Sequence, residues 1–175
     1  MINKILVAVD RFGENQSAYD SAICLAQKTE AQVMLLHVIS ESQSSYPILP
    51  TYAYYPIMDD RDFEVYREKL DEYKQLGIDF LVNLTQKASE AGVNAEYTQA
   101  IGNPGRKICE LASTWNADLI LVGSRGLKGL KEMFLGSVSN YVTHHAPCSV
   151  LIARDNSSPN SEPEVTEARE LIEQI

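Results

Sequence analysis

Two glycine-rich stretches near the C-terminal end of the chain have the composition of a phosphate-binding loop. They read Gly123-Ser124-Arg125-Gly126 and, after nine more residues, Gly136-Ser137. The first stretch follows a strand-like run at 118–122, and the second precedes a run with helical spacing. Such a turn leaves backbone N–H groups open to an anion, and the helix dipole adds partial positive charge. We therefore predict a phosphate cradle here, with an ordinary turn and helix start as the alternative.

The residues of these stretches suit phosphate in different ways. Gly123, Gly126 and Gly136 let the backbone approach a phosphate without a clash from Cβ. Ser137 and Ser139 either cap the following helix or donate their hydroxyls to phosphate oxygens.

Positive charge lies close to the same stretches. Arg125, Lys128 and Lys131 would attract phosphate oxygens. For Lys128 and Lys131 the alternative is an ordinary solvated lysine.

Two positions earlier in the chain are candidates for the other half of a nucleotide site. Asp10 ends the first strand-like run, where its carboxylate either accepts from a ribose hydroxyl or an adenine amine, or caps the next turn. The backbone of Val38 offers one donor and one acceptor to an adenine edge. In doubly wound sheets, ligands bind beyond the carboxyl ends of the strands where strand order reverses. If the order is 3-2-1-4-5, Asp10 faces the same crevice as the glycine loop.

The segments that must position these residues alternate between strand and helix patterns. Apolar, β-branched runs predict strands at 5–9, 33–39, 95–101, 117–122 and 149–153. Amphipathic spacing predicts helices at about 15–30, 60–91, 105–115 and 137–145. This alternation predicts an α/β fold with a three-layer, doubly wound, five-stranded parallel sheet.

The predicted helix at 60–91 is longer than a sheet is wide. Its apolar stripe runs from Phe63 to Ala91 at three- and four-residue spacing, so we predict that the stripe faces the sheet as core. At 1.5 Å per residue the helix would be roughly 48 Å long, and we expect it to bend near Gly77 or to protrude at its first turn. Gly92 is predicted to end it.

Two stretches depart from the alternating pattern. Residues 40–59 are rich in Ser, Pro and Tyr and form either a solvated excursion or a lid or partner-contact loop. Residues 155–175 hold six acidic residues and one arginine. They begin with a linker composition and end, at 165–175, with helical spacing that predicts a short helix, either docked or frayed. We predict one domain at 1–154 and an acidic linker with a short C-terminal helix at 155–175.

Charge and composition disfavour several classes of protein. The net charge is −9, and neither the body nor the tail has the basic face that a non-specific nucleic-acid binder needs. No apolar run is long enough to span a membrane, and the N-terminus reads as a strand rather than a signal peptide. Three scattered cysteines, Cys24, Cys109 and Cys148, fit reduced, inert core thiols. We expect a cytoplasmic protein with no membrane or nucleic-acid partner.

The common enzyme motifs are missing from the sequence. It has no Gly-x4-Gly-Lys-Ser/Thr loop and no Gly-x-Gly-x2-Gly run, which disfavours a P-loop ATPase or a Rossmann dehydrogenase. His37 is expected to be partly a core residue, and His144 and His145 suit a helix end better than a metal site. No base stands beside a nucleophile, so at most we expect slow hydrolysis with Mg²⁺ held by the phosphates.

The spacing Gly-x2-Gly-x9-Gly-Ser resembles that of the ATP-binding universal stress protein domains. The resemblance covers about residues 1–154 and includes the strand ending in Asp10, the run 36–38, the turn 102–104, and the segments 118–124 and 147–152. It implies a Rossmann-like fold of the adenine nucleotide alpha hydrolase-like kind, with bound ATP or another adenine nucleotide. It also implies a homodimer paired through the fifth strand, Val150 to Ala153.

The same likeness implies which residues touch the nucleotide. Adenine and ribose contacts fall on Ala8, Val9, Asp10 and Val38. Phosphate contacts fall on Gly123, Ser124, Arg125, Gly126, Gly136, Ser137, Val138 and Ser139. The chain departs from the family after Asp10, where it has Arg11-Phe12-Gly13 and family members often have a small or hydroxyl residue. Arg11 there either reaches a phosphate or is solvated.

The function implied is a stress-response or signalling module that binds an adenine nucleotide and contacts an unidentified protein partner. A nucleotide-independent interaction protein, using the 40–59 loop and the acidic tail, is one alternative. A slow ATPase is the other.

Overall fold

A computed structural model describes residues 1–11, 16–41, 46–47, 60–124 and 135–154. Strands and helices alternate along them as β1 (Lys4–Val9), α1 (Gln16–Thr29), β2 (Gln32–Ile39), α2 (Asp60–Glu90), β3 (Ala95–Ile101), α3 (Pro104–Trp115), β4 (Leu119–Gly123), α4 (Ser137–His145) and β5 (Ser149–Ala153). Each of these elements was predicted from the sequence to within two residues at either end.

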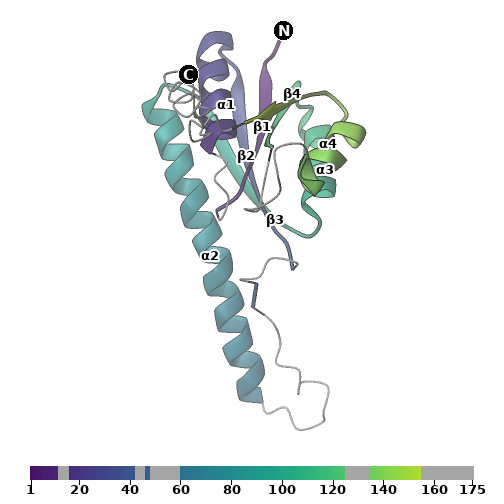
Figure 1. The fold of residues 1–175 in the computed structure, drawn as a ribbon. Helices are drawn as coiled ribbons and strands as arrows, with labels where there is room; N and C mark the ends of the chain where they lie inside the picture. The colour runs from purple at the N-terminus through teal and green to yellow at the C-terminus, as the bar shows by residue number, and fades with distance from the viewer. Residues whose placement is uncertain (12–15, 42–45, 48–59, 125–134, 155–175) are drawn as a thin grey trace, which may run out of the picture.

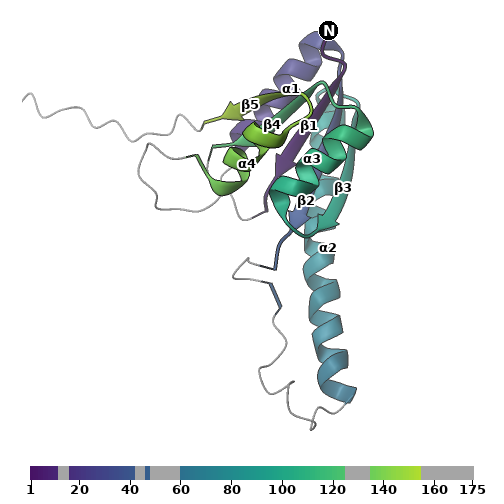
Figure 2. The same ribbon diagram turned by 90° about the vertical axis from the view of Figure 1, so that its right-hand side faces the viewer.

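The strands form a single parallel sheet in the order β3-β2-β1-β4-β5. Helices α1 and α2 cover one face of this sheet, and α3 and α4 cover the other (Figures 1 and 2). The predicted three-layer, doubly wound architecture and the predicted strand order are both confirmed. Strand order reverses between β1 and β4, which is where doubly wound sheets bind their ligands.

The core has two layers because side chains alternate across the strands. The layer against α1 and α2 includes Ile5, Val7, Val33 and Leu35. The layer against α3 and α4 includes Leu6, Met34, Leu36 and Val38. Both faces of the central strands are therefore apolar, which explains why these strands appear in the sequence as continuous apolar runs.

Helix α2 extends well past the edge of the sheet (Figure 1). From Tyr73 onward the helix has buried side chains, among them Tyr73, Leu81 and Ala88, whereas Phe63 near its start is 45% exposed. The prediction that the whole stripe from Phe63 onward forms core is therefore wrong for the projecting half, because no strand lies beneath it. The projection exceeds a first turn. Despite its length, α2 is highly charged, and no helix in the described ranges combines the length and apolarity needed to cross a bilayer.

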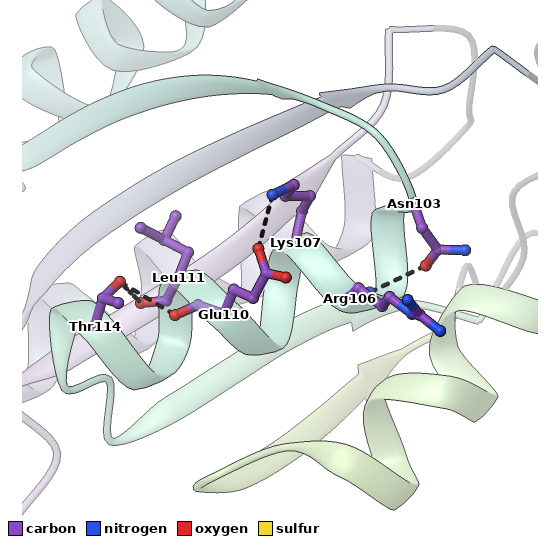
Figure 3. A network of polar contacts seen from close by, with 6 residues as sticks. All are labelled: Asn103, Arg106, Lys107, Glu110, Leu111 and Thr114. Carbon is purple, nitrogen blue, oxygen red and sulfur yellow. Dashed lines mark hydrogen bonds and ion pairs between the residues drawn. The ribbon is translucent and has the colours of Figure 1, made fainter.

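Residues with known helix-end preferences stand at the ends of two helices. Helix α3 begins with Pro104 after Asn103, whose side-chain oxygen accepts from the backbone N–H of Arg106 at 3.1 Å (Figure 3). Asn116 ends α3 in the left-handed conformation, with φ of 55°. Gly92 follows α2 with φ of 77°, as expected of a glycine after a helix.

The cysteines differ in part from expectation. Cys109 and Cys148 are half-buried, and burial raises the pKa of both thiols, which disfavours the reactive thiolate. Cys24 is exposed, so its prediction as a core thiol is wrong. The helical period of α1 turns Ala22 and Ala26 inward and leaves Cys24 on the outward face.

Asp118 joins the start of β4 to the start of β1. Its Oδ2 accepts from the backbone N–H of Asn3 at 2.8 Å and from that of Lys4 at 2.9 Å. These two bonds hold the pKa of Asp118 below its usual value. A carboxylate with a lowered folded pKa stabilises the fold above its unfolded pKa, and the contribution is lost as pH falls through the folded pKa.

We predict that Asp118→Asn lowers the urea midpoint at neutral pH and weakens the loss of stability below about pH 4. Urea unfolding measured across a series of pH values checks this. Asp20→Asn, at an exposed position on α1, is the matched control and should follow the parent profile. Parallel acid sensitivity in the parent and in Asp118→Asn would contradict this role for Asp118.

Helices α3 and α4 approach each other closely at Gly105. A Cβ at that position would lie 2.7 Å from Cδ1 of Tyr141. Alanine has a higher helix propensity than glycine, so propensity alone predicts that Gly105→Ala raises the free energy of unfolding, whereas the packing clash predicts that it falls. We predict that packing dominates and that the free energy of unfolding falls by about 1–3 kcal/mol in urea denaturation. Most of this loss should disappear in a Tyr141→Ala background, and an equal loss in both backgrounds would refute the packing explanation.

Candidate functional site

The sheet brings three predicted site residues to its carboxyl edge. Strands β1 and β4 are neighbours, so Asp10 directly after β1 and Gly123 at the end of β4 lie at the same edge. Val38 lies on β2 at this edge, one residue after His37, which is paired with Val9. The strand order 3-2-1-4-5 is what makes these residues neighbours, as expected from the sequence.

Helix α4 begins beside the end of β4 and is bonded to it. The hydroxyl of Ser139, a residue only 5% exposed, donates to the carbonyl oxygen of Gly123 at 2.6 Å. The backbone N–H of Gly136 donates to the carbonyl of Ser124 at 3.1 Å, and Ser124 itself donates to the carbonyl of Ala153 at 2.8 Å. These bonds hold the first turn of α4 at the carboxyl edge of the sheet.

The first turn of α4 presents backbone donors at this edge. Gly136 occupies the N-cap with φ of −58° and ψ of 153°, and it has no side chain to cap the helix. The N–H groups of Ser137, Val138 and Ser139 therefore have no acceptor within the helix. Together with the positive end of the helix dipole, they form an arrangement suited to an anion.

The two serines of this turn differ from expectation. Neither is the N-cap, because the helix starts at Ser137 and Gly136 precedes it. The hydroxyl of Ser139 already donates to the carbonyl of Gly123, so Ser139 would donate to a phosphate through its backbone N–H. Ser137 is exposed, which leaves its hydroxyl accessible.

The side chains of the predicted adenine contacts face the core. Val9 is 6% exposed and Val38 is 8% exposed, on opposite faces of the sheet. Ala8 packs on the same side as Val38. With these side chains in the core, any contact that Val9 and Val38 make beyond the strand ends would involve their backbone groups, and the predicted use of the Val38 backbone stays a prediction.

Several predicted positions lie outside the described residues. Among the site residues these are Arg125 and Gly126, with Lys128 and Lys131 nearby. Most of the 40–59 loop and all of 155–175 also lie outside them. The roles predicted for these positions stay predictions.

Arg11, where the chain departs from the family pattern, contacts α2. Its guanidinium lies over the ring of Tyr73, 5.2 Å from the ring centroid. From the sequence we expected Arg11 to reach a phosphate or to be solvated, and the contact with Tyr73 was not predicted. This contact connects the segment that carries Asp10 to α2.

His37 is a core residue, as expected, and is 2% exposed. Burial lowers the pKa of His37, while the charge of Asp10 raises it and that of Arg11 lowers it further. Its partner Gln99, on β3, was not singled out from the sequence, where a glutamine within a strand carries no distinctive signal. No group of three or more His, Cys, Asp or Glu side chains within the described ranges is arranged to hold a metal.

A groove of about 260 Å³ lies away from these residues, between β3 and α3. Leu36, Ala100 and Leu111 line it, and an ion pair of 2.8 Å joins Lys107 to Glu110 on α3 beside it (Figure 3). None of the predicted site residues lines this groove.

Comparison with known proteins gives consistent matches. The sequence model of the universal stress protein family matches residues 1–154. The chain is 40% identical over 151 residues to universal stress protein Sll1388 of Synechocystis sp., covering 86% of this chain and 97% of that protein. The fold is similar to universal stress protein UspA from Lactobacillus plantarum, with a TM-score of 0.69 and 26% identity, over 87% of this chain and 98% of that one.

Two solved structures of similar fold contain a nucleotide. One is a universal stress protein family protein from Arabidopsis thaliana with AMP bound, with a TM-score of 0.58 over 91% of this chain and 97% of that one. The other is a universal stress protein in complex with cAMP, with a TM-score of 0.52 over 87% and 97%. Both are 22% identical to this chain, and the likeness establishes the shared fold.

The hydrogen bond from Ser139 to Gly123 should stabilise the start of α4 against the end of β4. Ser139→Ala should lower the free energy of unfolding by about 1 kcal/mol, because the buried carbonyl of Gly123 loses a donor. It should also reduce amide-exchange protection in the first turns of α4. Ser137→Ala, at an exposed position on the same turn, is the control and should change stability by less than about 0.5 kcal/mol. Equal effects of the two substitutions would show that this bond does not anchor α4.

Proposed function

Because the chain belongs to the universal stress protein family, we propose that it binds an adenine nucleotide, with ATP as the first candidate, at the carboxyl edge of its sheet. The observation that carries the proposal is the placement of Asp10, Val38 and the first turn of α4 around the point where strand order reverses. The AMP and cAMP found in proteins of the same fold support this class of ligand.

In this proposal the two ends of the nucleotide meet different chemistry. The phosphates lie at the first turn of α4, where the N–H groups of Ser137, Val138 and Ser139 and the helix dipole attract negative charge. Ser124 and the glycines at 123, 126 and 136 complete the cradle, with Arg125 adding positive charge. A carboxylate would repel phosphate, so Asp10 belongs with the ribose or the adenine amine.

The adenine and ribose end is held largely by backbone groups. Val9 and Val38 keep their side chains in the core, and together with Ala8 they present backbone groups at the strand ends. A base edge needs one donor and one acceptor, which a single residue's backbone supplies. Any Mg²⁺ that accompanies ATP is held mainly by the phosphates, the usual mode for this ion.

We further propose that the chain is a cytoplasmic signalling or stress-response module that acts as a homodimer paired through β5. In the described part of the sheet β5 has β4 on one side and no strand on the other. Leu151 on this strand is 36% exposed. An edge strand carries unpaired backbone groups that a second copy can pair with.

The nucleotide proposal is tested by denaturing the purified protein, chromatographing the supernatant for adenine nucleotides, and titrating the nucleotide-free protein with ATP, ADP, AMP and cAMP by calorimetry. Asp10→Asn should weaken ATP binding about tenfold or more, because it removes a charge-assisted hydrogen bond. Asp118→Asn is the same change at the opposite edge of the sheet and should leave the affinity unchanged. A folded parent that releases no nucleotide and shows neither heat nor a thermal shift with ATP would overturn the proposal.

A further inference from the structure

A buried polar contact under α2 takes no part in the proposed nucleotide contacts. His37 on β2 lies opposite Gln99 on β3, and both side chains meet α2. The amide nitrogen of Gln99 lies 3.2 Å from Nδ1 of His37 and donates to the backbone carbonyl of Lys74 at 3.1 Å. Gln99 therefore links two strands of the sheet to α2.

This contact determines where the ring proton of His37 lies. The carbonyl of Lys74 is only an acceptor, so the Gln99 atom facing it must be the amide nitrogen. The second hydrogen of this nitrogen is directed to Nδ1 of His37, which must be unprotonated to accept it. The ring proton therefore lies on Nε2, a buried atom with no hydrogen-bond partner among the described residues.

Helix α2 comes this close to the sheet because residue 77 is glycine. A Cβ at Gly77 would lie 2.8 Å from Nδ1 of His37 and would overlap the amide nitrogen of Gln99. One turn further along α2, Phe80 meets the His37 ring edge to face, with 6.3 Å between centroids. The backbone of α2 at Gly77 therefore lies directly against the His37 and Gln99 side chains.

Among the described residues, charged groups lie near His37 in the segment after β1 and on α2. Asp10 and Arg11 follow β1, and their effects on the pKa of His37 oppose each other. On α2, the ammonium of Lys74 pairs with Asp71 at 3.1 Å. Burial has the largest effect and lowers the pKa of His37. The ring is therefore fully neutral above the ordinary histidine pKa, and the neutral form is lost as pH falls through the lowered pKa.

Two uncharged side chains from the described residues also lie near His37. Gln99 of β3 is uncharged and faces Nδ1 with a donor. Tyr73 of α2 is 7% exposed and lies under the guanidinium of Arg11.

We propose that His37, Gln99 and Gly77 form a proton-sensitive pin that holds α2 against the carboxyl end of the sheet. A proton taken from solvent by Nδ1 of His37 faces the amide donor of Gln99, so this hydrogen bond is lost. The same proton places a positive charge in a site only 2% exposed. Helix α2 then loosens around Lys74 and Gly77, while the strands remain paired.

The pin lies next to the proposed nucleotide site. Val9, which precedes Asp10, is paired with His37, and Arg11 contacts α2 through Tyr73. Loosening of α2 removes the support under Arg11 and displaces the segment that carries Asp10. This consequence, which rests on the proposed function, makes proton binding and nucleotide binding antagonistic.

The pin is tested without nucleotide by NMR titration of the histidine rings between about pH 8 and pH 5, with amide exchange measured at each pH. His37 should protonate below the ordinary histidine pKa, because burial lowers its pKa. Its protonation should coincide with loss of exchange protection in α2 around Lys74, while the amides of β2 stay protected. Unchanged protection of α2 across the titration of His37 would overturn the proposal.

Variants make the test specific. His37→Gln keeps an acceptor for Gln99 but cannot be protonated in this range, so protection of α2 should become independent of pH. His145→Gln removes an exposed titratable group from α4 and should leave the parent response intact. Gly77→Ala should reduce protection of α2 even at pH 8, against its helix propensity. A pH response retained in His37→Gln would overturn the pin. If that variant does not fold, the test rests on the parent, where the protonation of His37 and the loss of protection in α2 must occur at the same pH.

A second measurement separates the pin from the proposed function. The Kd for ATP should rise about tenfold per pH unit below the pKa of His37 in the parent and not in His37→Gln, a comparison that removes the titration of ATP itself. ATP binding with the same pH profile in both proteins would overturn the coupling and leave the proposed function standing. Absence of ATP binding at pH 8 would overturn the proposed function, and the exchange measurements would still decide the pin.

Discussion

The pairing of β1 with β2 on one side and β4 on the other is the constraint on which the rest of the structure depends. A buried strand must place its backbone groups in a ladder, and β1 carries the fully buried side chains of Ile5, Leu6 and Val7. Parallel strands end at the same edge, so this pairing decides which connections meet there. The chain leaves β1 toward one face of the sheet and β4 toward the other, and Asp10 and α4 come together where these paths diverge.

The carboxyl edge that results has two electrostatic ends. Asp10 contributes negative charge after β1, whereas the first turn of α4 presents backbone donors and the positive end of a helix dipole after β4. A ligand with one anionic part and one neutral part is favoured in a single orientation. The bond from Ser139 to Gly123 fixes the donors in advance, which would reduce the ordering cost of the proposed ligand binding.

Helix α2 shows how the limited width of the sheet divides one element into two parts. Its C-terminal half lies on β2 and β3, where Gly77 brings it onto His37 and Gln99. A polar pair inside an apolar layer carries a desolvation cost, and satisfying its hydrogen bonds requires one axial position of the helix. The N-terminal half has no strand beneath it, so Phe63 remains 45% exposed although it has the same spacing as the buried residues.

The sequence by itself determined the helices, the strands and the glycine-rich connection of the candidate site, because the signals for these are local, whereas the strand order 3-2-1-4-5 entered as an assumption that the structure confirmed. Continuous apolar runs marked the strands, amphipathic spacing marked the helices, and the glycine spacing marked the strand-to-helix connection after β4. Only the tertiary structure decided which distant side chains meet, as in the contacts of Ser139 with Gly123, Arg11 with Tyr73 and His37 with Gln99. The last of these pairs is separated by 62 residues. No local pattern specifies such a pair, because the contact arises from the strand order together with the position of each helix on the sheet.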